Sequence, residues 1–372
     1  MSLATILALS LTLHLYIGAR LVPQLPWPAG LALAGLLLAS AVLVPLSMLA
    51  RRFFRAPASD RLTWAGMLCM GLFSSLLVLT FMRDLMLLAL RLANIDAPQW
   101  DENTAAAVPL LALALSLIGL INARRTAPVV RVKVPIAGLP PPLEGFRIVQ
   151  ISDIHVGPTI KRDYLEAIVA RVNGLEADVV AITGDLVDGS VAELAEHVAP
   201  LAQLKSRHGT FFVTGNHEYY SGVHGWLQEL ERLGVRVLQN EHVVLHHAGA
   251  DLVLAGVPDY SGHHFDPSHR SDPRAALHGA PAGAPRVLLA HQPRTAPAAA
   301  DAGFDLQLSG HTHGGQFLPW SLFVPLQQPY TAGLHQLGRL AIYVSRGTGY
   351  WGPPKRIGAP SEIAELILSP SV

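Results

Sequence analysis

The sequence predicts an α/β domain preceded by a bundle of four transmembrane helices. Three observations predict this architecture. Four apolar stretches of membrane-spanning length lie in the first third of the 372 residues, short β-branched runs alternate with helical segments in the remainder, and polar residues of a few types follow five of those runs. The 27 basic residues balance 27 acidic ones, so the chain lacks the basic field typical of nucleic-acid-binding proteins, and no nucleic-acid partner is expected.

The four apolar stretches are long enough to cross about 30 Å of hydrocarbon at about 1.5 Å per helical residue. The first of them lacks a basic n-region and a cleavage site, so it is predicted to be a retained helix. The segment 83–94 is predicted to extend the third span as an amphipathic helix at the interface. A transmembrane anchor is therefore expected over residues 1–126, with spans at about 3–22, 29–50, 62–82 and 104–122.

Basic residues predict the orientation of this anchor. They cluster in the loop between the second and third spans and after the fourth span, at Arg51, Arg52, Arg55, Arg61, Arg124, Arg125, Arg131 and Lys133. Because basic loops stay on the cytoplasmic side, both termini and the following domain are expected there, in a multi-pass protein of a bacterial inner membrane. A fifth crossing through residues 83–94 is the alternative, and it would move the domain outside.

A linker is predicted over residues 127–145 and a folded domain over 146–372. Within that domain, apolar runs of a few residues bounded by turn residues are typical of buried strands. Alternation of such strands with a helix-period segment at 162–174 favours an α/β sheet. The predicted strands are 147–152, 178–183, 210–214, 251–257, 286–290, 305–308 and 340–345.

Five of the predicted strands are followed directly by potential metal ligands. Open α/β sheets place their sites at the carboxyl ends of the strands. A single Asp or His there is usually a turn residue or a helix cap, but five in succession indicate a metal site. The residues are Asp153 and His155, then Asp185 and Asp188, then Asn216, His217 and Glu218, then His291, and finally His311 and His313.

The types of ligand narrow the choice of metal. Cys69 is the only cysteine, so a cysteine-based site is excluded. Carboxylate, amide oxygen and imidazole together suit Mn²⁺, Fe or Zn²⁺ better than Cu(I), and they include too much nitrogen for Ca²⁺. The ligands exceed the needs of one ion, which predicts two divalent ions about 3.5–4 Å apart. We expect Mn²⁺, with Fe or Zn²⁺ as alternatives.

The order of these motifs resembles a known family. D-x-H, G-D-x-x-D, G-N-H-E, a lone strand-end His and G-H-x-H occur in the order found in the calcineurin-like metallophosphoesterases, through residues 147–369. The stretches "GHTHGGQ" and "SRGTGYWGPPKR" resemble the bacterial YaeI/YkuE-type branch, and the preceding helices resemble those of transmembrane proteins with a metallophosphoesterase domain. The resemblance implies an α/β/β/α sandwich, two β-sheets flanked by helices.

The resemblance also implies a role for each residue. The first metal would be bound by Asp153, His155, Asp185 and His313, and the second by Asp185, Asn216, His291 and His311. Asp185 would therefore bridge the two ions. His217 would be the non-ligand histidine beside the substrate, with Asp188 as the partner of His217 or of the ligands. Weaker candidates for substrate contact are Arg346, Tyr350 and Arg356, which fit a structural Gly/Pro-rich turn equally well.

The expected activity is hydrolysis of a phosphoester or pyrophosphate bond by a hydroxide that bridges the two metals. The membrane anchor suggests a lipid-linked substrate and a bilayer partner. Two alternatives stay open. One is a broad-specificity phosphatase for nucleotides or other phosphomonoesters. The other is a binding or transport module in the membrane, with the phosphatase domain as its regulator.

Overall fold

The computed structural model describes residues 3–95 and 99–371. Contacts within the chain separate them into two units. The first unit contains the residues up to Arg124 together with two short later stretches, Phe317–Pro319 and Gly352–Ile357, and the second unit contains the rest.

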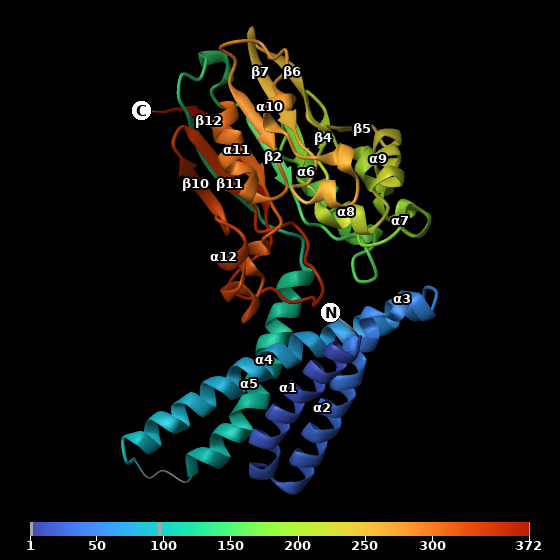
Figure 1. Ribbon diagram of the computed structural model, residues 1–372, viewed down its shortest axis with the longest axis vertical. Coiled ribbons are helices and arrows are strands. Elements are labelled where there is room, and N and C mark those ends of the chain that lie inside the picture. Colours follow the sequence, from blue (N-terminus) through green and yellow to red (C-terminus); the bar gives the residue numbers. More distant parts are fainter. Residues whose placement is uncertain (1–2, 96–98, 372) are drawn as a thin grey trace. The chain divides into compact units, whose positions relative to one another are not determined.

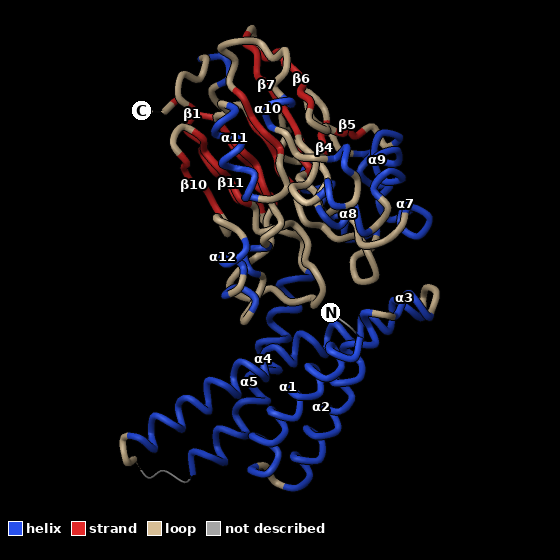
Figure 2. The backbone as a smooth tube through the Cα atoms, in the orientation of Figure 1, coloured by secondary structure: helices blue, strands red, loops and turns tan. Residues whose placement is uncertain are grey.

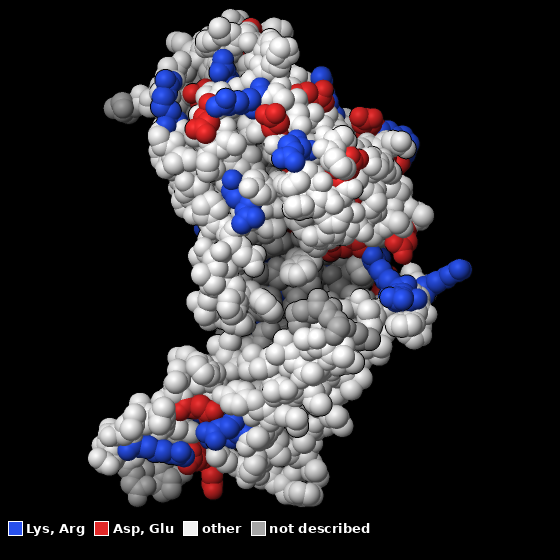
Figure 3. Space-filling view, viewed as in Figure 1, with Lys and Arg blue, Asp and Glu red and all other residues white. Residues whose placement is uncertain are grey.

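Four long helices dominate the first unit and run up and down beside one another (Figure 1). They are α1 (Leu3–Leu21), α2 (Trp27–Met48), α4 (Ala58–Leu92) and α5 (Gln99–Arg124), and the short α3 (Ala50–Phe53) follows α2. All four are long and apolar enough to cross a membrane, which confirms the predicted bundle. Charged side chains lie near the ends of these helices and leave an uncharged band between them (Figure 3). Residues 83–92, predicted as an interfacial extension, continue α4 without a break.

Several polar side chains inside this unit are paired, as apolar surroundings favour. His14 of α1 places Nε2 2.9 Å from Ser40 Oγ of α2. Arg20 of α1 donates from Nε to Asp84 Oδ2 of α4 at 2.8 Å. These pairs fix the register of the helices against one another.

The stretch Gly352–Ile357 is held by α4 and α5. Lys355 is buried, and its Nζ donates to Gly71 O at 2.6 Å and to Ser75 Oγ at 2.5 Å, both on α4. Arg356 N donates to Gly119 O of α5 at 3.0 Å. Gly119 provides the necessary space, because a Cβ there would lie 2.6 Å from Lys355 Cγ. The first unit therefore needs this late stretch of chain to complete its packing.

The second unit is built on two six-stranded sheets (Figure 2). The first has the order β1 (Val129–Ile136), β12 (Ile363–Pro370), β2 (Arg147–Ile151), β3 (Val179–Ile182), β4 (Thr210–Phe212) and β5 (Val235–Val237). The second has the order β10 (Gly333–Leu337), β11 (Leu340–Val344), β9 (Leu306–Ser309), β8 (Arg286–Leu289), β7 (Ala250–Gly256) and β6 (Glu241–His247). Pairs β2–β3–β4–β5 and β7–β8–β9–β11 are parallel.

The main core lies between the two sheets. Ile148 and Val179 of the first sheet pack in one cluster with Leu254 and Leu289 of the second. The outer face of the second sheet packs against α11 (Ala296–Ala302) through a further apolar cluster. The remaining helices are α6 (Arg162–Asn173), α7 (Val191–Val198), α8 (Asn216–Tyr220), α9 (Val223–Arg232), α10 (Pro273–Ala276) and α12 (Val324–Gln327). The predicted mixed α/β fold is confirmed.

The structure departs from the predicted linker at residues 129–136. These residues form β1, which pairs in parallel with β12 from Val129↔Ile363 to Ile136↔Pro370. The alternation in VVRVKVPI fits a strand, but its partner is the last strand of the chain. A pairing between such distant segments leaves no local signal in the sequence.

Candidate metal centre

The predicted ligands converge at the carboxyl edges of the two sheets. Asp153 follows β2, Asp185 follows β3 and Asn216 follows β4, while His291 and His311 follow β8 and β9. The two sheets meet at this point, because His311 N donates to Asp153 Oδ1 at 2.9 Å. Facing sheets with parallel central strands thus bring loops from distant parts of the sequence to one place.

One group of ligands consists of Asp153, His155 and His313. His155 Nε2 lies 3.0 Å from His313 Nε2, and His313 Nε2 lies 3.5 Å from Asp153 Oδ1. The other ring nitrogen of His155, Nδ1, faces Asp188 Oδ1 at 3.2 Å. If that nitrogen carries the proton, the Nε2 lone pair points at its neighbours and is available to a cation.

A second group consists of Asp185, His291 and His311, with Asn216 beside them in the loop after β4. His291 Nδ1 donates to Thr183 O at 2.7 Å, which leaves the Nε2 lone pair free. That Nε2 lies 3.2 Å from Asp185 Oδ2 and 3.2 Å from His311 Nδ1. Within the described part of the chain, the buried Asn216 Oδ1 has no hydrogen-bond partner. A buried acceptor left unpaired is costly, and a cation would satisfy it.

Asp185 lies between the two groups. Its Oδ2 is 3.2 Å from His291 Nε2 and 3.9 Å from His155 Nε2, while its Oδ1 accepts from the backbone N of His217 at 2.9 Å. Lone pairs and carboxylate oxygens therefore converge without enough donors to satisfy them. This donor set fits divalent cations, and the clustered His and Asp side chains could hold them.

Five of the seven predicted ligands have left-handed backbone. The φ angles are 54° at Asp153, 58° at His155, 50° at Asp185, 70° at His311 and 50° at His313. Such conformations are uncommon for residues other than glycine and cost of order 1–3 kcal/mol each. They turn each side chain sharply after its strand. The free energy stored here must be offset by the packing of the two sheets.

Two glycines allow the loops to pack against the ligands. A Cβ on Gly215 would lie 2.2 Å from Asp185 Oδ1, and a Cβ on Gly310 would lie 2.1 Å from Asp153 Oδ2. Both distances are shorter than any real contact of a methyl group. Close approach, rather than an unusual backbone angle, requires glycine at these two positions.

Asp188 joins the ligand His155 to the histidine predicted beside the substrate. Its Oδ1 is 2.5 Å from His217 Nδ1 and 3.2 Å from His155 Nδ1. Burial lowers the pKa of His217, but the carboxylates of Asp185 and Asp188 outweigh it and raise the pKa to about 9. Burial favours the neutral form of Asp188, but the two histidines bring its pKa well below the usual range. His217 and Asp188 therefore form a tight, charge-assisted pair.

Two further residues belong to the centre: Glu218, which the sequence places after a predicted strand without a specific role, and Trp351, which the sequence did not single out. Glu218 is fully buried and accepts from three backbone N–H groups, those of Gly215 at 2.6 Å, Asp185 at 3.0 Å and Leu186 at 2.8 Å. Burial and the charge of Asp185 raise the pKa of Glu218 to about 8. Trp351 places its ring 5.8 Å from that of His217 and is half exposed. The fourth letter of G-N-H-E was the only sequence signal for Glu218.

The three weaker candidates for substrate contact have different positions. Arg346 packs beside the metal loop, where a Cβ on Gly314 would lie 3.1 Å from Arg346 Cγ, and its guanidinium pairs with Glu362 at 2.7 Å. Tyr350 is buried and donates to Thr159 O at 3.2 Å. Arg356 is fully buried within the helical unit. The burial of Tyr350 and Arg356 favours the structural turn, which the sequence left open as the alternative to substrate contact.

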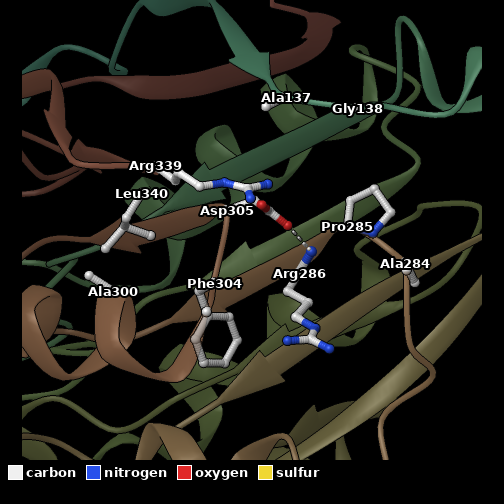
Figure 4. A pocket seen from close by; sticks show the side chains of 12 residues that line it. Ala137, Gly138, Ala284, Pro285, Arg286, Ala300, Phe304, Asp305, Arg339 and Leu340 are labelled. Atoms are coloured by element: carbon white, nitrogen blue, oxygen red, sulfur yellow. Dashed lines mark hydrogen bonds between the residues drawn. The ribbon is translucent and has the colours of Figure 1, made fainter.

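A cavity of about 380 Å³ lies away from this centre (Figure 4). It is found where β8, β9 and β11 begin, and its lining includes Arg286, Asp305 and Arg339. Arg286 N donates to Asp305 Oδ2 at 2.9 Å. None of the predicted ligands lines it. The chemistry of the chain is thus concentrated at the opposite ends of these strands.

Comparison with known proteins matches the part of the chain that contains these loops. Residues 146–315 match the family described as calcineurin-like phosphoesterase. The chain is 44% identical over 271 residues to a transmembrane protein with metallophosphoesterase domain of Bos taurus, covering 70% of this chain and 61% of the relative. It is 37% identical over 264 residues to an uncharacterized metallophosphoesterase of Campylobacter jejuni, covering 70% and 68%. It is 31% identical over 245 residues to the uncharacterized metallophosphoesterase YkuE of Bacillus subtilis, covering 62% and 81%.

Proposed function

The chain belongs to the calcineurin-like phosphoesterase family, and we propose that it is a membrane-anchored phosphohydrolase that uses two divalent metal ions. The observation that carries this proposal is the position of Asp185. One oxygen of its carboxylate, Oδ2, faces both ligand groups, at 3.2 Å from His291 Nε2 and 3.9 Å from His155 Nε2. A single carboxylate shared in this way suits two neighbouring cations better than one.

In this proposal the first ion is held by Asp153, His155, Asp185 and His313, and the second by Asp185, Asn216, His291 and His311. When bound, the ions would neutralise phosphate oxygens and lower the pKa of a water molecule enough for it to attack phosphorus. The chain's own contribution is to fix the ligands before substrate arrives. Asp188 and Thr183 do so by holding the Nδ1 atoms of His155 and His291.

His217 is proposed as the group that protonates the leaving oxygen. Asp188 accepts from His217 Nδ1 at 2.5 Å, and His217 Nε2 lies 3.9 Å from Asp185 Oδ2. His217 could also join His155 and Asp185 around a metal, but we assign it to the substrate because Asp188 holds it as a charged ring. The imidazolium can therefore donate from Nε2 to the departing oxygen and regain a proton from water. Asp188 acts as a positioning residue that favours the charged ring.

The experiment is hydrolysis of bis-p-nitrophenyl and mono-p-nitrophenyl phosphate by the full-length chain with Mn²⁺. Asp185→Asn is expected to lower kcat/KM on the better substrate by at least about 10³-fold, because it removes charge shared by both sites. Asp251→Asn is the control, since the Asp251 side chain on β7 is 44% exposed and faces His246 instead of any proposed ligand. Full metal-dependent turnover by Asp185→Asn would refute the two-metal proposal.

We propose Mn²⁺ as the metal, with Fe and Zn²⁺ as the competing choices. The ligands combine hard carboxylate and amide oxygens with imidazole, and such mixed sets suit Mn²⁺ and Fe as well as Zn²⁺. Activity regained by metal-free protein on addition of each ion separates them. We expect the highest kcat with Mn²⁺. A higher kcat with Zn²⁺ or Fe²⁺ would reject Mn²⁺ as the metal.

A lipid-linked phosphate is proposed as the substrate. Residues 314–338 contain no Asp, Glu, Lys or Arg, and within them the apolar segment 320–327 exposes large side chains, including Leu322 at 65% and Leu326 at 80%. This segment packs on the metal loop, because a Cβ on Gly315 would lie 2.4 Å from Ser321 Cα. Exposed apolar groups beside a phosphate-cleaving centre suit the acyl part of a lipid. The four membrane helices support the same interpretation.

The segment is tested by Leu326→Glu in the full-length chain. Burying one leucine in lipid contributes about 1.5–3 kcal/mol, so the variant should lose roughly tenfold or more in kcat/KM on a phospholipid in mixed micelles, relative to its change on bis-p-nitrophenyl phosphate. An equal change on both substrates would reject a lipid-binding role. Preference of the native chain for soluble nucleotides over phospholipids would favour the broad-specificity phosphatase instead.

The catalytic domain is proposed to lie on the cytoplasmic side of a bacterial inner membrane. The support is the excess of arginine around the start of α4 and after α5. Arg51, Arg52 and Arg55 lie between α2 and α4, and Arg61 lies in the first turn of α4. A green fluorescent protein fused to the C-terminus should fluoresce, whereas an alkaline phosphatase fusion should be inactive. The reverse pair of results would place the domain outside.

A further inference from the structure

A second cluster of metal-binding side chains lies outside the centre described above. His224 of α9, together with Asp266 and His269 of the loop 259–269, places its ligand atoms within 4.8 Å of one another. We propose that these residues form a third metal site, for a transition-metal ion of the Zn²⁺ class. The cluster shares no residue with the proposed catalytic ligands, so it does not depend on the proposed hydrolysis.

The distances suit a common ion. His224 Nε2 lies 3.2 Å from Asp266 Oδ2, and His269 Nε2 lies 4.0 Å from the same oxygen. Ligands about 2.0–2.2 Å from a tetrahedral zinc ion are about 3.3 Å apart, so the first pair already fits. Binding requires His269 and Asp266 to approach by several tenths of an ångström. His224 has room to follow, because its side chain is 69% exposed.

Neighbouring groups orient two of the ligands. Asp266 Oδ1 accepts from Ser268 N at 2.9 Å and from Ser268 Oγ at 2.6 Å, which leaves Oδ2 directed at the histidines. His269 Nδ1 lies 2.9 Å from the hydroxyl of Tyr219, so its Nε2 is the nitrogen left for a metal. Partners of this kind set the orientation and tautomer of ligands in known metal sites.

The burial of the cluster matches a site with open coordination positions. The His269 side chain is 9% exposed and that of Asp266 is 23% exposed, so the inner side is closed by protein. The outer side, at His224, is open to solvent. Two imidazoles and one carboxylate with remaining positions for water are a ligand set used for Zn²⁺ and for Fe²⁺.

A bound ion would clamp the loop 259–269 onto the helices next to the proposed catalytic centre. Phe265 of this loop packs on Tyr219 and Tyr220, with ring centroids 5.6 Å and 5.5 Å apart. Tyr220 in turn lies 5.2 Å from His217. The ion would therefore join α9 to a loop that supports α8, the helix that begins with Asn216 and His217.

The test counts Zn²⁺ bound to the full-length chain by equilibrium dialysis and elemental analysis. The native chain is expected to bind one more equivalent than His224→Ala and than Asp266→Asn, which keeps an oxygen for Ser268. His246→Ala is the matched control, because His246 is an exposed histidine whose Nδ1 is 2.5 Å from Asp251 Oδ1, outside every ligand group. It should bind as many equivalents as the native chain.

A second readout is proteolysis within the loop 259–269, which Zn²⁺ should slow in the native chain and in His246→Ala but not in His224→Ala. Equal Zn²⁺ content in the native chain and in both site variants would overturn the third site. The Zn²⁺ content of Asp185→Asn separates the proposed catalytic centre from the proposed third site. If Asp185→Asn keeps all its metal while His224→Ala loses one equivalent, the catalytic pair is wrong and the third site stands.

Discussion

Replacement of Gly310 by alanine tests whether the loops must approach the ligands as closely as they do. An alanine Cβ at this position would lie 2.1 Å from Asp153 Oδ2 and 2.1 Å from Ser152 Oγ. Ordinary contact begins at 3.4 Å, so the carboxylate or the loop must move by about 1.3 Å. Asp153 cannot move freely, because both of its oxygens accept from His311 N, at 2.9 Å and 3.1 Å.

The expected loss follows from this displacement. Misplacing a group by about 1 Å at a reacting centre can cost about 10²-fold, and forcing one extra methyl group into a packed site costs about 1–3 kcal/mol. Gly310→Ala should therefore lower kcat/KM on bis-p-nitrophenyl phosphate by about 10²-fold. It should also weaken metal retention and lower the thermal unfolding midpoint. Activity and metal content are measured on the full-length chain in detergent.

Gly174→Ala is the matched control. Gly174 ends α6 with φ −72°, and a Cβ there would lie 3.6 Å from Arg171 O, which is ordinary contact. This variant should keep native activity and gain about 0.4–1 kcal/mol of stability from the reduced freedom of the unfolded chain. If Gly310→Ala had the same kcat/KM and the same bound metal as Gly174→Ala, the close packing at Gly310 would not position the ligands, and the predicted loss would be refuted.

Three other variants test separate contacts. His217→Asn should lower kcat by about 10²–10⁴-fold without loss of metal, and loss of metal with it would make His217 a ligand instead. At pH 9, above the pKa of Glu218, Glu218→Gln leaves one of three backbone N–H groups facing an amide donor in place of a carboxylate oxygen, so it should destabilise the chain by about 1–3 kcal/mol in thermal unfolding, and an unchanged midpoint would contradict the role of Glu218 in joining the two loops. Lys355→Ala removes the hydrogen bonds to Gly71 and Ser75, so a protease should cleave near residues 352–357 faster than in the native chain, and equal rates would contradict the anchoring of this stretch.

The sequence was sufficient to predict which side chains come together at the sheet edges, because each one follows a strand whose apolar pattern is local. Asp153, Asp185 and His291 follow buried strands. Because parallel strands place their sites at their carboxyl ends, these side chains are expected at the same edge of the sheet. The four membrane helices were equally predictable, since length and hydropathy decide them. In both cases the prediction uses only residues that are close to one another in the sequence.

Other features depend on distant partners and left no such signal. Strand β1 pairs with β12, and Lys355 is bound by α4, so neither can be recognised from its own neighbourhood. The left-handed backbone at His311 and His313 is imposed by packing of the loops, against local preference. The sequence places Glu218 among the polar residues after a strand but does not show that its carboxylate accepts from backbone N–H groups, because those partners lie in another loop as well as its own.

The most direct test of the shared carboxylate is electron paramagnetic resonance of the full-length chain loaded with two equivalents of Mn²⁺. Two ions that share Asp185 would be magnetically coupled, so we expect the spectrum of an exchange-coupled pair. Asp185→Asn should convert it into the spectrum of isolated Mn²⁺ together with the loss of activity. A native chain that is fully active and shows only isolated Mn²⁺ would contradict the two-metal centre.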